Sequence, residues 1–246
     1  MTQNPAIPAA TLVLVRERAG SSPELLMVER AEGMAFAGGA LVFPGGRIDD
    51  SDRALGGDEI GAAKVAAIRE PIEATAIPAG LKGVTDPQVA LELQNGLMAD
   101  GPLPALLERY SLALELDELT AFARWVPKFH ATRRFDTLFF VARCPEGAWR
   151  PTVVEGECTA AHWITADEAL QRDREGKARL IFPTRRNLER LALHSSFESI
   201  KADAEAHPIE PISPWVEQIE GENFITIPEG IGYPVTREKL DGLWRG

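Results

Sequence analysis

The sequence contains very little cysteine. Cys144 and Cys158 are the only two among 246 residues, and they do not form a Cys-x-x-Cys pair. A zinc site built on thiolates is therefore not expected, because such sites use closely spaced cysteines. Two isolated thiols are typical of a reducing compartment, so we expect both to be reduced and the protein to be cytoplasmic.

Long apolar runs and an excess of basic residues are also missing. No stretch approaches the ~20 apolar residues that a membrane helix needs, and the first residues lack the basic and apolar regions of a signal peptide. The formal net charge is -11. A nucleic acid or an anionic membrane surface would meet a field of like charge. We therefore expect neither nucleic acid nor membrane as a partner.

The remaining composition is that of a globular protein. Hydrophobic residues make up 45% and charged residues 26% of the chain, which is close to the average of folded domains. The length allows one large domain or a compact domain with additions. The chain shows no internal repeat.

The spacing of apolar residues predicts a mixed order of strands and helices. Runs of β-branched residues predict strands, the first two forming a hairpin, and a spacing of three to four residues predicts helices. The predicted strands are 10–15, 24–29, 40–43, 123–126, 137–141 and 158–164, and the predicted helices are 61–74, 86–98, 102–112, 165–175 and 184–193. This order predicts an α+β fold, an α/β/α sandwich with mixed sheets.

Prolines interrupt these patterns in two places. Pro71 lies inside the helix predicted over 61–74, where a proline removes one hydrogen bond and typically costs ~3 kcal/mol. We therefore expect this helix to be bent, or to break near Glu70. The segment from His207 to Pro214 contains three prolines. It predicts an extended tail, with a terminal hairpin around 222–227.

Two glutamates follow a glycine-rich turn. Gly45 and Gly46 follow Pro44 at the end of the strand predicted over 40–43, and Glu70 and Glu73 lie three residues apart on the next helix. Residues with this spacing share one helix face. Carboxylates on one face suit hard cations such as Mg²⁺ or Mn²⁺. A solvated helix face is the alternative interpretation.

The same residues carry a resemblance to a known family. The segment from Phe43 to Asp49, Phe-Pro-Gly-Gly-Arg-Ile-Asp, and the later segment from Ala66 to Ile77 resemble the two halves of a Nudix box. The segments 26–46, 122–127 and 133–140 are similar to a bacterial Nudix branch related to the peroxisomal coenzyme A diphosphatase type. A Nudix domain is then expected over 8–195, with a helical insertion at about 84–116. A C-terminal helix and the extended tail occupy 196–246.

The resemblance implies a role for each residue of the box. Arg69 would anchor the box loop through a charge-assisted hydrogen bond, and Glu70 and Glu73 would bind Mg²⁺ or Mn²⁺. Ala74 stands where the family usually has a third metal-binding glutamate, and Ala76 stands where it has glycine. The box is therefore degenerate, and the loss of one carboxylate is expected to weaken metal binding.

The acid that precedes Arg69 in the family pattern is ambiguous. Counting six residues from Gly46 gives Asp52, but counting back from Arg69 gives Gly61, because extra residues separate the two halves. The other candidates are Asp49, Asp50, Asp58 and Glu59.

Further residues are predicted to complete the site. Glu155 and Glu157 lie where several Nudix proteins supply an extra ligand or base, and Glu157 is predicted to be catalytic; a charged loop is the alternative. The predicted substrate-binding residues are Arg30, Gly45, Gly46, Arg133 and Arg134. A guanidinium binds phosphate oxygens in a fork, although a surface ion pair is the alternative for each arginine.

Two functions are compatible with this pattern. The first is a metal-dependent hydrolase that cleaves a diphosphate bond in a nucleotide derivative, with coenzyme A or an acyl-CoA as the leading substrate. The second is a Nudix-fold nucleotide- or CoA-binding protein that has lost catalysis, which Pro71, Ala74 and Ala76 favour. In both cases the expected partner is a small-molecule nucleotide or CoA-type diphosphate, and a homodimer is an open alternative.

Overall fold

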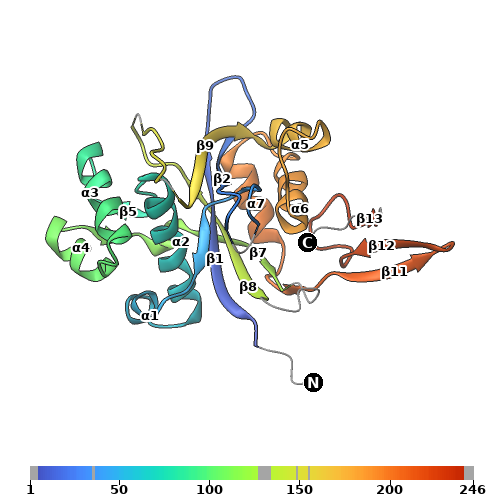
Figure 1. Cartoon of the computed structure of the whole chain (residues 1–246), viewed down its shortest axis with the longest axis horizontal. Helices are drawn as coiled ribbons and strands as arrows, with labels where there is room; N and C mark the ends of the chain where they lie inside the picture. The colour runs from blue at the N-terminus through green and yellow to red at the C-terminus, as the bar shows by residue number, and fades with distance from the viewer. Residues whose placement is uncertain (1–4, 35–36, 127–133, 148, 155, 241–246) are drawn as a thin grey trace.

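The computed structural model describes residues 5–34, 37–126, 134–147, 149–154 and 156–240. Within them, a mixed sheet of eight strands forms the centre of the molecule (Figure 1). The spatial order is β10, β7, β8, β1, β2, β3, with β4 also paired to β1 and β9 also paired to β2. The strands are β1 (Ile7–Arg16), β2 (Glu24–Arg30), β3 (Leu41–Val42), β4 (Gly45–Arg47), β7 (Thr120–Trp125), β8 (Phe135–Arg143), β9 (Cys158–Thr165) and β10 (Pro211–Ile212).

Strand β1 makes this sheet mixed. It is parallel to β8 and antiparallel to β2 and β4. The β1–β2 pair is the hairpin predicted from residues 10–15 and 24–29, and that prediction is confirmed. The mixed α+β architecture predicted from the order of elements is confirmed as well.

Helices cover both faces of the sheet. Alternate residues of a strand point to opposite faces, so Leu12 and Leu14 of β1 join one apolar cluster while Val13 and Val15 join another. The first cluster includes residues of α2 (Glu59–Thr75), α3 (Pro87–Met98) and α4 (Leu103–Tyr110), and the second includes residues of α5 (Ala166–Arg174), α6 (Phe182–Leu191) and α7 (Phe197–Ala206) (Figure 1). Among the described helices, none is both long and apolar enough to cross a membrane.

The residues between the two halves of the box form a helix that the sequence did not predict. α1 (Asp50–Gly56) precedes α2, and a Cβ atom added to Gly61 would lie 2.0 Å from the carbonyl oxygen of Gly56. Glycine at position 61 therefore lets the two segments approach closely. The side chain of Asp58 caps α2 by accepting from the backbone nitrogen of Gly61 at 2.7 Å. The helix consequently begins at Glu59, two residues before the predicted start.

Pro71 does not break α2. The helix runs without interruption from Glu59 to Thr75, so the break predicted near Glu70 is wrong, while a bend stays a prediction. The proline lacks the hydrogen bond to the preceding turn, at a typical cost of ~3 kcal/mol. Pro71 and Ile72 are both buried, and burying a large apolar side chain contributes about 1.5–3 kcal/mol. Packing of the helix therefore offsets the cost of the proline.

The predicted helical insertion contains α3 and α4. At its base, β5 (Leu81–Lys82) pairs antiparallel with β6 (Ala113–Leu114), and a 3₁₀ turn (Leu116–Glu118) follows β6. Apolar residues of both inserted helices belong to the same core cluster as residues of α2. The insertion therefore packs against the helix that carries the box glutamates.

The C-terminal segment is more ordered than an extended tail. β11 (Trp215–Ile219), β12 (Glu222–Thr226) and β13 (Arg237–Lys239) form an antiparallel sheet, and the β11–β12 hairpin extends away from the main sheet (Figure 1). The hairpin predicted around 222–227 is therefore confirmed. Ile225, Ile227 and Tyr233 join the same core cluster as Trp125. These side chains complete the core, so this part of the predicted tail packs against the domain, while the domain boundary at 195 stays a prediction.

Candidate functional site

The two glycines of the box turn have different neighbours. Strand β4 pairs with β1, with Gly45 opposite Thr11 and Gly46 opposite Ala10. A Cβ atom on Gly45 would lie 2.3 Å from Thr11 Oγ1, so glycine there lets the strands pair. A Cβ atom on Gly46 would lie 2.2 Å from Glu70 Oε1. Gly46 therefore leaves room for the Glu70 carboxylate against the backbone of the box loop.

Arg69 ties the two halves of the box together. Its guanidinium is buried, and its Nη2 donates to the carbonyl oxygen of Arg47 at 2.8 Å. This is the charge-assisted link to the box loop that the resemblance implied. Nη1 donates to Glu70 Oε1 at 3.0 Å and to Glu73 Oε2 at 2.9 Å. One nitrogen therefore holds both glutamates side by side on the same face of α2.

Asp52 holds the other edge of the guanidinium. Arg69 Nε donates to Asp52 Oδ1 at 3.1 Å, and Nη2 donates to Asp52 Oδ2 at 2.9 Å, which is the fork geometry of a strong arginine–carboxylate pair. Asp52 is fully buried, and its Oδ2 also accepts from the backbone nitrogen of Asp49 at 2.9 Å. The count of six residues from Gly46 therefore finds the acid that pairs with Arg69. We call Arg69, Asp52, Glu70 and Glu73 the Arg69 cluster.

Asp58 and Glu59 lie far from the Arg69 cluster. Asp58 caps the first turn of α2, and Glu59 is the first residue of that helix. At a rise of 1.5 Å per residue, Asp58 and Glu70 are separated by about 18 Å along the helix. Neither residue can therefore replace the missing carboxylate. Asp49 lies closer, with its Oδ2 atom 3.6 Å from Arg69 Nη2 and its side chain 59% exposed.

The Arg69 cluster carries more negative than positive charge, because three carboxylates share one guanidinium. Burial, reinforced by Glu73 and opposed by Arg69, raises the pKa of Glu70 to about 8. Burial also raises the pKa of Glu73 despite the lowering effect of Arg69. Burial alone would lower the pKa of Arg69, but Asp52 and the two glutamates hold it above its ordinary value. A further cation beside the glutamates would relieve this excess of negative charge.

Ala74, at the position where the family usually has a third glutamate, faces apolar side chains. Ala74 packs against a small cluster formed by Val28, Ala40, Val42 and Cys158. Residues 70 and 74 are four apart on the helix, so a carboxylate at position 74 would stand beside Glu70. In this chain an apolar contact with the neighbouring strands takes its place.

Arg30 and Glu157 both lie beside Cys158, where strands β2 and β9 pair. Arg30 ends β2 and is paired in register with Cys158 at the start of β9. Glu157 is exposed, and its charge helps to raise the pKa of Glu73. The charges of Arg30, Glu157 and Glu70 also act on the Cys158 thiol, whose pKa is raised mainly by burial. The structure thus brings these predicted site residues together around Cys158.

Among the remaining predicted site residues, the structure describes Arg134. Arg134 directly precedes β8, which is across β1 from the box strand β4, and its carbonyl oxygen accepts from the backbone nitrogen of Ile7 at 2.7 Å. Arg133 and Glu155 lie outside the described residues. A role of these three residues in the site stays a prediction.

Glu70 and Glu73 fit one particular mode of metal binding. Among the described residues, no group of three or more His, Cys, Asp or Glu side chains is arranged to hold a metal ion. Mg²⁺, however, usually keeps several water molecules and is bound through one or two carboxylates together with substrate phosphate. The two glutamates fit this mode better than a site made of protein ligands alone.

Sequence reasoning missed Gln94 and Thr152. Gln94 is buried on α3, and its Nε2 donates to the carbonyl oxygens of Glu73 at 3.0 Å and Thr152 at 2.8 Å. The backbone nitrogen of Thr152 donates to the carbonyl oxygen of Thr75 at 2.8 Å. Gln94 lies four residues after the buried Ala90 on the apolar face of α3. A polar residue on such a face indicates a buried hydrogen bond, and this signal could have found it.

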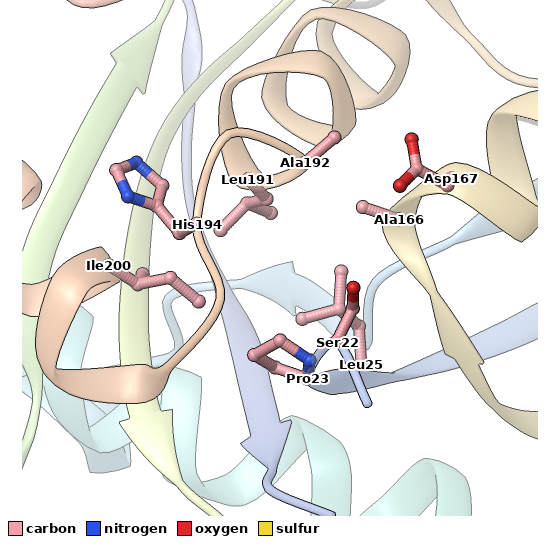
Figure 2. Close-up of a pocket in the computed structure, with 9 residues that line it drawn as sticks. All are labelled: Ser22, Pro23, Leu25, Ala166, Asp167, Leu191, Ala192, His194 and Ile200. Atoms are coloured by element: carbon pink, nitrogen blue, oxygen red, sulfur yellow. The ribbon is translucent and has the colours of Figure 1, made fainter. Parts of the chain in front are cut away.

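A small pocket lies on the other side of the sheet, away from the Arg69 cluster. It is lined by residues from the β1–β2 connection and from α5, α6 and α7, including Pro23, Leu191 and Ile200, together with Asp167 and His194 (Figure 2). No predicted site residue lines this pocket. The Arg69 cluster is therefore the candidate site.

The mixed sheet, the glycine turn and the glutamates held by Arg69 define a Nudix type of fold, and two known proteins support this class. No protein-family model matches the chain. The chain is 25% identical over 224 residues to a curated protein of Caenorhabditis elegans named "Putative nudix hydrolase 7", which covers 89% of this chain and 70% of that protein. It also resembles the crystal structure of a NUDIX hydrolase from Alicyclobacillus acidocaldarius, with a TM-score of 0.70 and 29% sequence identity over 80% of this chain and 96% of that one.

These similarities support the Nudix hydrolase superfamily as the class of this protein. They also support a hydrolase as its kind of activity. The relation to the coenzyme A diphosphatase branch and the degeneracy of the box stay predictions.

Proposed function

We propose that this protein is a metal-dependent hydrolase that cleaves a diphosphate bond in a nucleotide derivative. The observation that carries the proposal is the excess of carboxylates at Arg69. Glu70 and Glu73 share one guanidinium nitrogen, and burial raises the pKa of Glu70 to about 8. A buried carboxylate whose negative charge is only partly balanced by a neighbouring positive charge is stabilised by a cation. Mg²⁺ or Mn²⁺ at Glu70 and Glu73 is the proposed cofactor.

The residues of the box have distinct tasks in this proposal. Arg69 holds the carboxylates of Glu70 and Glu73 next to one another, and Asp52 fixes the orientation of Arg69 from the other side. Because Gly46 has no side chain, the Glu70 carboxylate can lie against the backbone of the box loop. When bound, the divalent cation would neutralise charge on the substrate phosphates and orient the attacking water.

The substrate would meet residues of the neighbouring strands. Arg30 Nε is buried and has no hydrogen-bond partner among the described residues, and a guanidinium binds phosphate oxygens well. Arg30 is therefore the arginine proposed to contact the diphosphate. Glu157, exposed and within electrostatic range of Glu73, is proposed as the general base for the attacking water. Arg133, Arg134 and Gly45 remain predicted substrate-binding residues.

Coenzyme A or an acyl-CoA is the proposed substrate. The support is the resemblance of residues 26–46, 122–127 and 133–140 to the branch related to coenzyme A diphosphatases. Kinship of fold does not by itself fix a substrate, so the substrate is the first quantity to measure. A cytoplasmic location and a homodimeric assembly belong to the same proposal.

A second function is favoured by the surroundings of Ala74. An apolar contact replaces the third carboxylate, and no described group of three acidic, histidine or cysteine side chains is arranged for a metal ion. The alternative is therefore a nucleotide- or CoA-binding protein that has lost catalysis.

Cleavage assays on a substrate panel separate the two functions. Coenzyme A, NADH, ADP-ribose and dinucleoside polyphosphates are tested with Mg²⁺ or Mn²⁺. For a hydrolase, the wild-type protein is expected to cleave at least one of them. Ala74→Glu adds a carboxylate beside Glu70 and is expected to raise Mn²⁺ affinity and rate by about 10-fold. Ala74→Gln has the same size without the charge, so as the control it is expected to raise neither.

Two other results would change the conclusion. If the wild type cleaves nothing but Ala74→Glu cleaves one of the compounds, the binding protein is the correct function. If neither protein binds Mn²⁺ or cleaves any compound, the metal-dependent hydrolase is contradicted.

A further inference from the structure

We propose that Gln94, on the inserted helix α3, is a positioning residue that sets the placement of Glu73 relative to Glu157. The inference rests on the proposed metal-dependent function, in which Glu73 binds the cation and Glu157 acts as base. It gives the helical insertion a task in the site, although no residue of the insertion contacts the box carboxylates among the described hydrogen bonds.

Gln94 is a buried amide that bridges two distant segments. Its side chain belongs to a residue that is only 2% exposed. Nε2 donates to the carbonyl oxygen of Glu73, 21 residues away in sequence, and to that of Thr152, 58 residues away. An amide nitrogen has two hydrogens, so both are used. The side chain thus connects the box helix to the segment that leads to Glu157.

The first of these carbonyls lies in the last turn of α2. The final carbonyls of a helix have no partner within the helix and need one from elsewhere. Here the carbonyl oxygen of Ile72 accepts from the backbone nitrogen of Ala76, and that of Glu73 accepts from the Gln94 side chain. The carbonyl oxygen of Thr75 accepts from the backbone nitrogen of Thr152. The end of the helix that carries Glu73 is therefore held by α3 and by the segment containing Thr152.

The second carbonyl belongs to Thr152, which precedes Glu157 in the sequence. At one end of this segment, Thr152 is bonded to both Gln94 and Thr75. At its other end, the carbonyl oxygen of Glu157 accepts from the backbone nitrogen of Ala31 at 2.9 Å. Val153 packs against the same apolar cluster as Ala74. Thr152 is thus held to the box helix and Glu157 to Ala31, and Gln94 bonds to both Glu73 and Thr152.

The arrangement matters because Glu73 is a proposed ligand. Residues that orient metal ligands from outside the coordination shell typically change metal affinity or activity by about 10–100-fold when they are removed. A buried amide on an apolar helix face is unfavourable unless it is hydrogen-bonded, and here one bond ends at Glu73 and the other at Thr152. Gln94 therefore fits a positioning role better than a role in packing alone.

The decisive variant is Gln94→Met, which keeps the length of the side chain but removes both donors. We expect Mn²⁺ affinity, measured by calorimetry on the metal-free protein, to fall about 10-fold. With the substrate found in the panel, kcat is expected to fall by a similar factor while KM changes little. Hydrogen exchange is expected to accelerate in residues 72–76 and 149–157. Gln94→Asn keeps the amide but draws it back by one carbon, so its losses are expected to be smaller.

Two controls on the same helix separate positioning from stability. Gln88 is exposed and its side chain donates only to Glu92 at 3.3 Å among the described contacts, so Gln88→Met is expected to change none of these quantities. Leu97 is a buried core residue of α3, so Leu97→Ala is expected to lower Tm at least as much as Gln94→Met without weakening Mn²⁺ binding.

The outcomes distinguish this proposal from the function on which it rests. Unchanged Mn²⁺ affinity and exchange in Gln94→Met would overturn the role of Gln94, and so would an equal loss of affinity in Leu97→Ala. A wild-type protein that binds no Mn²⁺ would refute the metal-dependent function instead. In that case the exchange experiment still decides whether Gln94 holds the two segments, because acceleration confined to Gln94→Met supports the link and its absence refutes it.

Discussion

Arg69 and Arg190 are buried arginines on opposite faces of the main sheet, but the charges around them differ. Arg190, in α6, is 1% exposed and donates to Asp203 Oδ2 at 2.7 Å and to the carbonyl oxygen of Phe122 at 3.0 Å. Its guanidinium carbon lies 4.2 Å from the ring centroid of Phe122 and 5.4 Å from that of Tyr233. Around Arg190, one positive charge is hydrogen-bonded to one carboxylate.

Around Arg69 the balance is different. This arginine is 5% exposed and also donates to a carbonyl oxygen, but its guanidinium is hydrogen-bonded to three carboxylates. A buried charge is costly unless it is paired. The balanced network at Arg190 is therefore expected to stabilise the fold, whereas the surplus at Arg69 is suited to a cation from outside. We therefore expect the charge balance of a buried network, more than its burial, to distinguish a cation site from a purely structural network.

The largest expected effect comes from removing either arginine. Breaking a buried ion pair typically costs about 3–5 kcal/mol, so Arg69→Met and Arg190→Met are each expected to lower the free energy of unfolding by this amount. Only Arg69→Met is expected to recover part of the loss in millimolar Mn²⁺, because the cation can take the place of the guanidinium charge. Urea unfolding with Mn²⁺ and with a chelator measures both effects. Equal recovery in the two variants would remove the proposed difference between the networks.

A second experiment exchanges one carboxylate in each network for its amide. Glu70→Gln removes a proposed metal ligand and is expected to lower kcat about 100-fold, equivalent to about 2.7 kcal/mol. Asp203→Asn is expected to leave kcat unchanged and to lower stability, because Arg190 loses its only hydrogen-bonded carboxylate among the described residues. Steady-state kinetics and thermal unfolding of the same preparations compare the pair.

The difference in stability between the wild type and Glu70→Gln should depend on pH. In the folded protein the pKa of Glu70 is about 8, above the ordinary value of 4.5, so ionisation favours the unfolded chain and stability is lost as pH rises through this interval. Without metal, the variant is therefore expected to be more stable than the wild type at pH 8 and similar to it at pH 4.5. A variant that is less stable at pH 8 would contradict the charge surplus.

The smallest expected effect concerns two alanines that end helices on opposite faces. Ala76 ends α2 in the left-handed conformation, with φ of 56°, which costs a residue with a Cβ atom roughly 1–2 kcal/mol. In Ala76→Gly, relief of this strain offsets the lost methyl burial and the freer unfolded chain, so stability is expected to change by less than about 0.5 kcal/mol.

The matched control is Ala192→Gly at the end of α6. Ala192 has a φ of -63°, so there is no strain to relieve, and the substitution is expected to cost about 1 kcal/mol. Urea unfolding of both variants gives the difference. Equal losses would show that Ala76 is not strained.

Most of the fold could be predicted because the relevant signals are local. Runs of apolar, β-branched residues predicted the strands of the β1–β2 hairpin, and local sequence patterns predicted α3 and α4. The break predicted near Glu70 was wrong, because propensity counts the hydrogen bond lost at Pro71 and not the packing of a buried helix. The packing of the C-terminal tail was not predicted either, because it also depends on tertiary contacts. Its prolines are local, whereas the burial of Ile225 and Tyr233 depends on residues far away in sequence.

Some features of the candidate site could also be predicted from local spacing, and others could not. Glycines and glutamates at fixed spacing determined that Glu70 and Glu73 share a helix face close to a glycine turn. The ambiguity between Asp52 and Gly61 could not be settled from spacing, because an unpredicted helix, α1, brings Asp52 to Arg69 across 17 residues.

By itself, the sequence determined the order of elements, the glycine turn and the pair of glutamates, since each of these depends on residues close together in the chain. Only the tertiary structure decided which acid pairs with Arg69, that Ala74 meets an apolar wall, and that Gln94 joins the box helix to the segment before Glu157. The hydrogen bonds among these contacts join residues 17 to 58 positions apart. These contacts depend on how whole helices and strands pack against one another, and local sequence patterns do not predict that packing.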